Sequence, residues 1–316
     1  MQRLEYFFGG NFVQSNDEQA EVEMMDYVLS ISPTYNRFLN YAHEKHSEKI
    51  IEVLKGNPRV NLITDSGAYS GLEDVDGYMD FLRENGKFLD YYVNVDVLNE
   101  GERSWKNYLR MRKEGFDPIP VWHAGTNEKY LLRYLSETNY VGIGGIAGKR
   151  FTTRKTIEIL DPIFSKHLLD KDGYPKNRYH AFGLTWEVLR RYPFRSADST
   201  DWVFYSGELT AILVPKSRDG QWDFLQNPRS LKVGTQHEKL DGHLLNPELE
   251  IRQEVRRYLQ ENKFRYGLFT YENGERVDII DGLYNLQAMR DRVNALFCIR
   301  FAQSLPPWPW PFKVKT

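Results

Sequence analysis

The sequence has a single cysteine, Cys298, among 316 residues. One cysteine excludes a disulfide framework, cysteine-rich zinc sites and cysteine-ligated iron–sulfur clusters. No apolar run approaches the ~20 residues that a membrane-spanning helix needs. The first residues also lack a basic segment followed by a long apolar stretch, so they do not resemble a secretory signal. From these absences we expect a cytoplasmic protein without a membrane partner.

The sequence also lacks an excess of either positive or negative charge. The 42 Lys and Arg residues and 44 Asp and Glu residues give a net charge of −2, so the bulk charge does not indicate a nucleic-acid or membrane partner. Hydrophobic residues make up 41% and charged residues 27%, which is typical of a folded protein. Aromatic residues reach 14%. A tyrosine-rich core explains that figure more simply than a surface that stacks on flat ligands.

Short apolar or β-branched runs alternate with segments of helical periodicity along the first 200 residues. The predicted strands are Leu4–Phe8, Tyr27–Ile31, Val60–Thr64, Tyr91–Val95, Pro118–Trp122, Tyr140–Ile143, Tyr179–Gly183 and Arg195–Asp198. The predicted helices are Pro33–Leu54, Val75–Asn85, Glu102–Glu114, Asn127–Glu137, Lys155–Leu169 and Thr185–Tyr192. Strand–helix alternation requires a parallel sheet. The fold class predicted is α/β, a (β/α)₈ TIM barrel.

The tail has a different pattern. Residues 201–247 are predicted to form a β insertion, because Trp202–Pro215 and Gln221–Val233 alternate around the turn signal Asp219-Gly220. Residues 248–316 are predicted to hold closing helices at Glu248–Glu261 and Leu283–Gln303, followed by a Pro/Trp-rich arm that cannot be helical. We expect the barrel of residues 1–200 and this tail to form one domain.

Chemically versatile residues recur where the predicted strands end. In a TIM barrel the catalytic groups come from these carboxyl ends. The candidates are Asp65, Tyr69, Asp96, His123, Gly144, Gly145, Phe182 and Asp198. Each also has a structural explanation: an Asp before Ser-Gly is often a helix N-cap, a histidine can serve as a supporting side chain, and a lone glycine cluster is weak evidence.

Three chemistries could use this set. Metal-dependent hydrolysis needs clustered His and carboxylate ligands, and the seven scattered His residues do not favour it. Retaining glycosyl transfer needs one carboxylate as nucleophile and another acid/base, roles that Asp198 and Asp65 fit. Recognition of a guanine-like base needs a carboxylate, backbone N–H groups and an aromatic face. Asp96, the Gly144-Gly145 amides and Tyr69 or Phe182 fit those roles. No metal and no cofactor is predicted.

The series Thr64-Asp65-Ser66-Gly67-Ala68-Tyr69, Asp96, Gly144-Gly145-Ile146-Ala147 and an Asp after the last strand resembles the tRNA-guanine transglycosylase superfamily. Its phage and bacterial branch, the 7-deazaguanine DNA transglycosylases, looks most similar, through His180–Thr185 and Ser196–Trp202. The resemblance covers about residues 1–200 and not the tail.

The resemblance implies exchange of a guanine in a nucleic acid for a 7-deazaguanine through a covalent glycosyl-enzyme. Asp198 would be the nucleophile at the sugar C1′, and Asp65 the general acid/base. Asp96 would bind the Watson–Crick edge of the base, and Gly144 and Gly145 would donate to its O6.

Two further positions complete the base site that the resemblance implies. Tyr69 would take the place of the family's stacking aromatic residue. His123 stands where the tRNA enzymes carry a glutamine, so that base contact departs from the family pattern.

The tail departs further from the tRNA enzymes, which carry a structural zinc on three cysteines and one histidine. The matching region here has His237 and His243 but no cysteine, which favours DNA over tRNA as the polymer. The candidate phosphate contacts are Lys149, Arg150, Arg154 and Arg256. A basic cluster on a helix is more often a solvated face. Open alternatives are a tRNA enzyme of the same family, a glycoside hydrolase using the same two Asp residues, and a non-catalytic nucleic-acid-binding barrel.

Overall fold

The computed structural model describes residues 2–10, 18–146, 151–184, 186–234, 244, 249–273 and 275–313. Its contacts divide the chain into two compact units. Unit 1 comprises Met1–Gly10, Ser32–Ser199 and Leu305–Thr316, and unit 2 comprises Asn11–Ile31 and Thr200–Ser304. The sequence predicts one domain overall; the contacts instead form two units, and the helix that follows the first strand belongs to the second of them.

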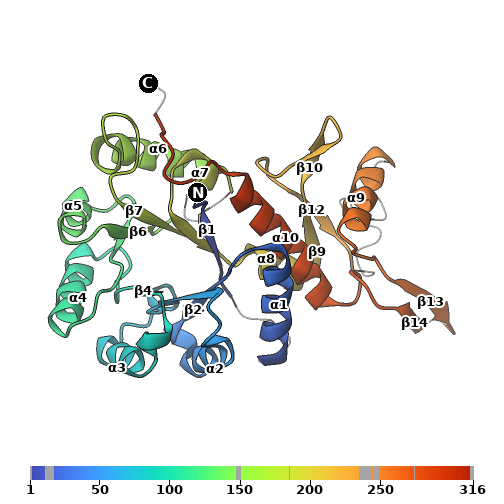
Figure 1. Ribbon diagram of the computed structural model, residues 1–316, viewed down its shortest axis with the longest axis horizontal. Helices are drawn as coiled ribbons and strands as arrows, with labels where there is room; N and C mark the ends of the chain where they lie inside the picture. The colour runs from blue at the N-terminus through green and yellow to red at the C-terminus, as the bar shows by residue number, and fades with distance from the viewer. Residues whose placement is uncertain are drawn as a thin grey trace. The chain divides into compact units, whose positions relative to one another are not determined.

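Unit 1 is built on eight parallel strands (Figure 1). They are β1 (Glu5–Phe8), β2 (Tyr35–Asn40), β3 (Val60–Asp65), β4 (Tyr91–Tyr92), β5 (Val121–His123), β6 (Tyr140–Gly144), β7 (Arg178–Phe182) and β8 (Ser196–Ser199). Their order in the sheet is β4-β3-β2-β1-β8-β7-β6-β5. A parallel bridge between Val93 and Ile119 joins the β4 side to the β5 side. The predicted (β/α)₈ barrel is therefore confirmed.

Helices follow most strands of unit 1. They are α2 (Glu44–Leu54), α3 (Val75–Asn85), α4 (Gly101–Lys113), α5 (Glu128–Glu137), α6 (Thr153–Ile163) and α7 (Trp186–Arg191). A π-helical segment, Phe164–Leu168, extends α6, and short 3₁₀ turns lie at Tyr41–His43, Ala68–Ser70 and Gly86–Phe88. Side chains cap the starts of α3, α5 and α6; the Asn127 side chain, for example, accepts from the Lys129 amide at the start of α5. The apolar face of α5 is buried on the strands.

The second predicted strand is wrong. Tyr27–Ile31 forms the end of helix α1 (Glu18–Ile31), in which Met24 and Val28 are buried one turn apart. The strand in this position is β2, which the sequence predicts as helical. Polar residues obscured its strand pattern. Arg37 is buried because its guanidinium donates to the carbonyl oxygens of Phe8 at 2.6 Å and Gly10 at 2.7 Å.

The inside of the barrel is apolar in its middle. Side chains from several strands form one buried cluster, comprising Phe7, Ile63, Val93, Ile119, Val121 and Tyr140. The Pro/Trp-rich arm lies on unit 1, where the Trp308 amide donates to the Gln2 carbonyl at 2.7 Å and its indole to the Pro193 carbonyl at 3.0 Å. The polar groups of Trp308 are thus hydrogen-bonded while its aromatic ring packs on the protein.

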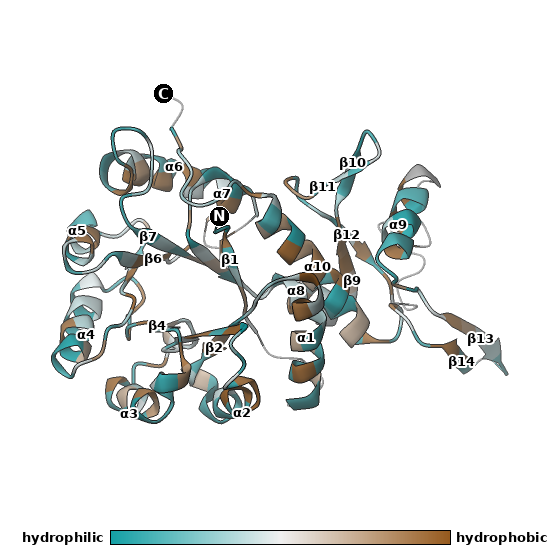
Figure 2. Cartoon of the chain, in the orientation of Figure 1, coloured by the Kyte–Doolittle hydropathy of each residue, from teal (hydrophilic) through white to brown (hydrophobic). Residues whose placement is uncertain are grey.

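Unit 2 surrounds a buried helix, α10 (Gln287–Ser304), which contacts α1, α8 and β9. Its other elements are α8 (Asp201–Gly207), β9 (Ala211–Val214), β10 (Lys216–Arg218), β11 (Gln221–Asp223), β12 (Arg229–Lys232), α9 (Leu249–Glu261), β13 (Leu268–Glu272) and β14 (Glu275–Ile280). The strands pair as three antiparallel ribbons, β9 with β12, β10 with β11 and β13 with β14. Figure 2 shows β9 as a strongly hydrophobic strand of this unit.

The β insertion expected over residues 201–247 holds in part. Asp219 and Gly220 turn β10 into β11 with φ values of 51° and 79°. Trp202–Gly207, however, is helical, and its buried residues Trp202, Val203 and Ser206 follow helical spacing. None of the helices described is both apolar enough and long enough to cross a membrane.

Candidate functional site

The predicted site residues of unit 1 lie at the carboxyl ends of their strands. Asp65 ends β3, Asp96 lies in the loop after β4, His123 ends β5, Gly144 ends β6, Phe182 ends β7, and Asp198 lies in β8. Because the strands are parallel, these residues share one end of the barrel. The sequence prediction of a common site at this end agrees with their placement.

Asp65 is the carboxyl group most affected by its surroundings. The backbone N–H groups of Ser66 and Gly67 donate to it. Burial, and then the negative charges of Asp96 and Asp198, nevertheless raise the pKa of Asp65 to about 8. The Asp65 carboxyl group therefore keeps its proton to a higher pH than an ordinary aspartate, and it lies close enough to the other two carboxyl groups to be influenced by both.

The turn after Asp65 requires glycine. Gly67 has a φ of +90°, and a Cβ there would lie 2.9 Å from the Cβ of Ala42. The Asn40 side chain in turn accepts from the Ala42 amide at 2.8 Å. These contacts fix the backbone amides that face the Asp65 carboxyl group.

Asp96 is held by His123. The His123 Nε2 atom lies 2.6 Å from Asp96 Oδ2, and its Nδ1 atom accepts from the Asn99 amide at 2.9 Å. Since Nδ1 accepts, Nε2 carries the proton and donates to Asp96. Both ring nitrogens are thus engaged. The prediction that His123 contacts the base directly is corrected: in this arrangement the ring positions Asp96.

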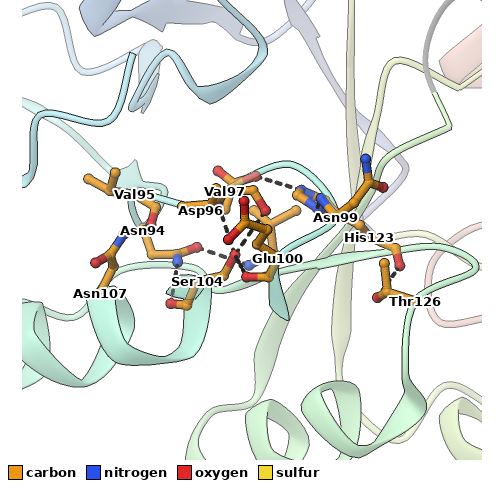
Figure 3. A network of polar contacts seen from close by, with 11 residues as sticks. Asn94, Val95, Asp96, Val97, Asn99, Glu100, Ser104, Asn107, His123 and Thr126 are labelled. Atoms are coloured by element: carbon orange, nitrogen blue, oxygen red, sulfur yellow. Dashed lines mark hydrogen bonds and ion pairs between the residues drawn. The ribbon is translucent and has the colours of Figure 1, made fainter. Parts of the chain in front are cut away.

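The loop that carries Asp96 is tied to α4 by buried hydrogen bonds (Figure 3). The Asn94 side chain accepts from the Val121 amide at 3.0 Å and donates to the Ser104 carbonyl at 3.4 Å. The Ser104 hydroxyl accepts from the Val97 amide at 2.9 Å. Asp96 is therefore presented by a backbone that is fixed on both sides of it.

Asp198 is held by a second histidine. His180 is fully buried, with Nε2 3.3 Å from Asp198 Oδ1 and Nδ1 2.5 Å from Ser196 Oγ. The Ser196 hydroxyl lies 2.5 Å from the Tyr140 hydroxyl. The site thus contains two aspartates, each with a histidine as neighbour, and a third, Asp65, whose pKa is raised.

Packing explains the glycines after β6. A Cβ on Gly144 would lie 2.9 Å from Val121 Cγ1, and one on Gly145 would lie 2.9 Å from the Cβ of His123. Gly145 also has a φ of +75°. These positions admit only glycine because β5 lies against them. Donation by their amides to a base oxygen remains a prediction.

The two candidate stacking residues differ in availability. Phe182 packs inward, with its ring 4.4 Å from that of His180 and 6.1 Å from that of Phe38. Tyr69, in contrast, is 70% exposed in the turn after β3. Of the two, Tyr69 is the one free to stack on a ligand.

Two of the four predicted phosphate contacts, Arg154 and Arg256, belong to the described residues. Lys149 and Arg150, like His237 and His243, lie outside the described residues. Arg154 is exposed near the start of α6 and pairs with Glu158 at 3.1 Å. Arg256 is exposed on α9 of unit 2. In the described part of the chain, no three His, Cys, Asp or Glu side chains gather as metal ligands.

The candidates predicted from the sequence do not include His180 and Ser196, the residues that support Asp198. Ser196 lies two residues before Asp198 in β8, and His180 two before Phe182 in β7, so strand alternation places each pair on one face. That signal was present in the sequence. His180 and Ser196 lie next to each other because the register of β7 against β8 pairs these two residues.

Comparison with known proteins does not show a family for this chain. No protein-family model and no curated protein matches this sequence. Among solved structures, the chain is similar to one from the tryptophan synthase α2β2 complex of the hyperthermophile Pyrococcus furiosus. The identity is 11% and the TM-score 0.41, and the match covers 66% of this chain and 90% of that one.

Proposed function

We propose that the protein is a transglycosylase that exchanges guanine in DNA for a 7-deazaguanine derivative through a covalent glycosyl-aspartate. The observation that carries the proposal is the placement of Asp65 and Asp198 at the same end of the barrel, close enough for the charge of Asp198 to raise the pKa of Asp65. Two carboxyl groups whose surroundings make one hold its proton suit an acid and a nucleophile. The strand-end motifs that resemble the tRNA-guanine transglycosylase superfamily support the same assignment.

The first half of the exchange uses both groups. Asp198 attacks C1′ of the sugar, and an ester bond forms while the bond from C1′ to the base breaks. The electron pair of that bond goes to the guanine, which takes the proton from Asp65. In the second half, the incoming base returns a proton to Asp65, attacks C1′ and releases the Asp198 carboxylate. Atoms and charges balance without a further reactant.

Recognition of the base falls to the neighbouring loops. Asp96 offers acceptor oxygens to the N–H groups on the Watson–Crick edge of guanine, and His123 keeps it in place. The exposed ring of Tyr69 supplies a stacking surface. The base must leave its helical stack, which costs a few kcal/mol for a paired duplex.

DNA is favoured as the polymer because the chain lacks the cysteines of the tRNA enzymes. Cys298 is the only cysteine in the sequence, and it is buried in α10. A three-cysteine zinc site cannot be built from one cysteine. A tRNA enzyme of the same family is the second candidate, and the same assay distinguishes the two.

The test is to incubate the protein with DNA or tRNA in the absence of free 7-deazaguanine, and to look for a covalent protein–nucleic acid adduct and released guanine. We expect an adduct with DNA, and exchange when the free base is added. Asp198→Asn should lower both by about 10⁴-fold or more, as nucleophile removal does elsewhere. Asp90→Asn is a matched control, because Asp90 is exposed and lies before β4 at the other end of the barrel.

The outcomes separate the alternatives. An adduct with tRNA alone would replace DNA by RNA as the polymer. Release of free base without exchange would indicate a hydrolase. Full activity of Asp198→Asn would show that the nucleophile is wrongly assigned, and no adduct or exchange with either polymer would leave only a binding protein.

A further inference from the structure

A chain of hydrogen-bonded side chains runs through the inside of the barrel to Asp198. The Tyr140 hydroxyl is 2.5 Å from the Ser196 hydroxyl, which is 2.5 Å from His180 Nδ1. His180 Nε2 is 3.3 Å from Asp198 Oδ1. The four residues come from β6, β7 and β8, which are neighbours in the sheet.

One direction of donation satisfies every member of this chain. A carboxylate can only accept, so His180 Nε2 carries the proton that faces Asp198. The neutral ring then has Nδ1 as an acceptor for the Ser196 hydroxyl, and Ser196 Oγ accepts from Tyr140. The reverse direction would leave Nε2 without a proton facing the acceptor-only Asp198. The network therefore fixes the tautomer of His180.

The imidazole ring is also fixed in orientation. It is fully buried, and its centroid lies 4.4 Å from that of Phe182. The rings of Phe38 and Phe7 are each 6.2 Å away. A ring held between three phenylalanines cannot turn without opening the barrel interior, so its Nε2–H is a preorganised donor.

We propose that His180 is a positioning residue that selects the attacking oxygen of Asp198. Its Nε2–H holds Oδ1, whereas no residue in the described part of the chain is hydrogen-bonded to Oδ2. Oδ2 is therefore the atom that attacks C1′. This inference rests on the proposed exchange reaction and adds to it the group that orients its nucleophile.

The hydrogen bond persists through the covalent step. As the bond from Oδ2 to C1′ forms, the bond from C1′ to the base breaks, and Asp65 supplies the proton to the departing base. Oδ1 becomes the carbonyl oxygen of the ester and continues to accept from His180, which neither gains nor loses a proton. His180 thus supports the attacking carboxylate and the ester alike.

The activity test compares His180→Leu, which removes the donor, with His180→Gln, whose amide retains one. With the DNA substrate, we expect His180→Leu to slow covalent-adduct formation about 10- to 100-fold, the range for loss of a hydrogen bond to a charged group. His180→Gln should recover part of the rate. The dissociation constant for DNA should stay unchanged in both, because His180 does not face the polymer.

A matched control is His167→Leu. His167 also pairs with a carboxylate, its Nε2 lying 2.8 Å from Glu128 Oε2, but it lies in the π-helical segment away from the site. We expect normal adduct formation from this variant. Wild-type rates in folded His180→Leu would overturn the inference and leave the exchange proposal intact, whereas an inactive wild-type protein would overturn the exchange proposal itself.

A second measurement does not depend on activity. The ¹⁵N chemical shifts of His180 in the labelled wild-type protein distinguish a protonated ring nitrogen from a bare one. We expect a protonated Nε2 and a bare Nδ1, and Ser196→Ala should disturb this pattern, since Nδ1 loses its donor. A protonated Nδ1 in the wild type would contradict the proposed orientation, even where His180→Leu proves too unstable to assay.

Discussion

Asp65 connects the electrostatics of the barrel with the pH dependence of the proposed reaction. The pKa of about 8 follows from burial and from the charges of Asp96 and Asp198. Because the departing base needs a proton from Asp65, adduct formation should be fast below pH 8 and fall as pH rises through it. Asp96→Asn removes one of the two charges and should move this alkaline limb to lower pH. An alkaline limb that stays in place would show that Asp96 does not act on Asp65.

The raised pKa of Asp65 should also make the free energy of unfolding depend on pH. The unfolded chain releases the Asp65 proton near the usual aspartate pKa of 3.8, and the folded chain near 8. Between these values the folded state binds more protons, so the free energy of unfolding falls as pH rises from about 4 to about 8. Asp65→Asn removes the ionisable group that causes this fall in the free energy of unfolding. At pH 9 the variant should therefore unfold at a higher temperature than the wild type, although it should no longer catalyse exchange. An unfolding temperature of Asp65→Asn at pH 9 that is equal to or below that of the wild type would contradict the raised pKa of Asp65.

A second residue of this kind lies in unit 2. Asp291 is buried, accepts a hydrogen bond from Ser206, and burial raises its pKa to about 7 against the attraction of Arg290. Asp291→Asn should stabilise the fold at pH 8 by on the order of 3 kcal/mol. The gain should shrink toward pH 4, where the buried carboxyl is protonated in both states.

Chemical denaturation at pH 8 and pH 5 measures this difference. Asp26→Asn, an exposed change on α1 of the same unit, serves as the control and should have little effect at either pH. A stability gain from Asp291→Asn that is the same at both pH values would point to packing rather than to ionisation.

At the scale of elements, the loop between β4 and α4 is the part of the site held by the most buried hydrogen bonds. The Ser104 hydroxyl accepts from the Val97 amide and also lies 3.1 Å from the Glu100 carbonyl. Ser104→Ala leaves the Val97 amide buried without its acceptor, so we expect a loss of about 1–3 kcal/mol in unfolding free energy. Guanine binding should weaken as well, since Asp96 lies in this loop. Ser136→Ala, on the exposed face of α5, should change neither quantity.

Elements with one clear periodicity were predictable from the sequence. β3 is an apolar run ending in Asp65, and α3 was placed at its observed bounds, because burial and propensity agree there. β2 was missed because its buried Arg37 reads as polar, although its charge is satisfied by backbone carbonyls. The residues Asn273-Gly274 are a hairpin signal in the sequence, and β13 and β14 lie on either side of it.

The site was predictable as a set of strand-end residues but not as a network. Asp65, Asp96 and Asp198 stand out because each follows or ends a strand and can carry charge. The roles of His123 and His180 depend on which atoms their nitrogens meet, and those atoms come from other strands and loops. Such contacts follow from the barrel's register, which sequence spacing does not contain.

For the molecule as a whole, a net charge of −2 means that binding to a polyanion must rely on local basic groups. Most arginines in unit 1 pair with carboxylates, including Arg191 with Asp161 at 2.7 Å and Arg195 with Glu5. Arg154 lies near the start of α6, the helix that follows β6. It is therefore at the end of the barrel that carries the candidate site. Its side chain is 90% exposed, so a phosphate can compete with Glu158 for it.

The salt dependence of DNA binding tests this placement. If Arg154 contacts one phosphate, Arg154→Ala should weaken binding and reduce the slope of log affinity against log salt by about 0.9. Arg112→Ala is the matched control, because Arg112 also pairs with an exposed carboxylate, that of Asp117, but lies in the last turn of α4 before β5 begins. It therefore occupies the opposite end of the barrel. Equal slopes for wild type and Arg154→Ala would exclude the phosphate contact, while a reduced slope for Arg112→Ala would place the polymer on the wrong end for Asp65 and Asp198.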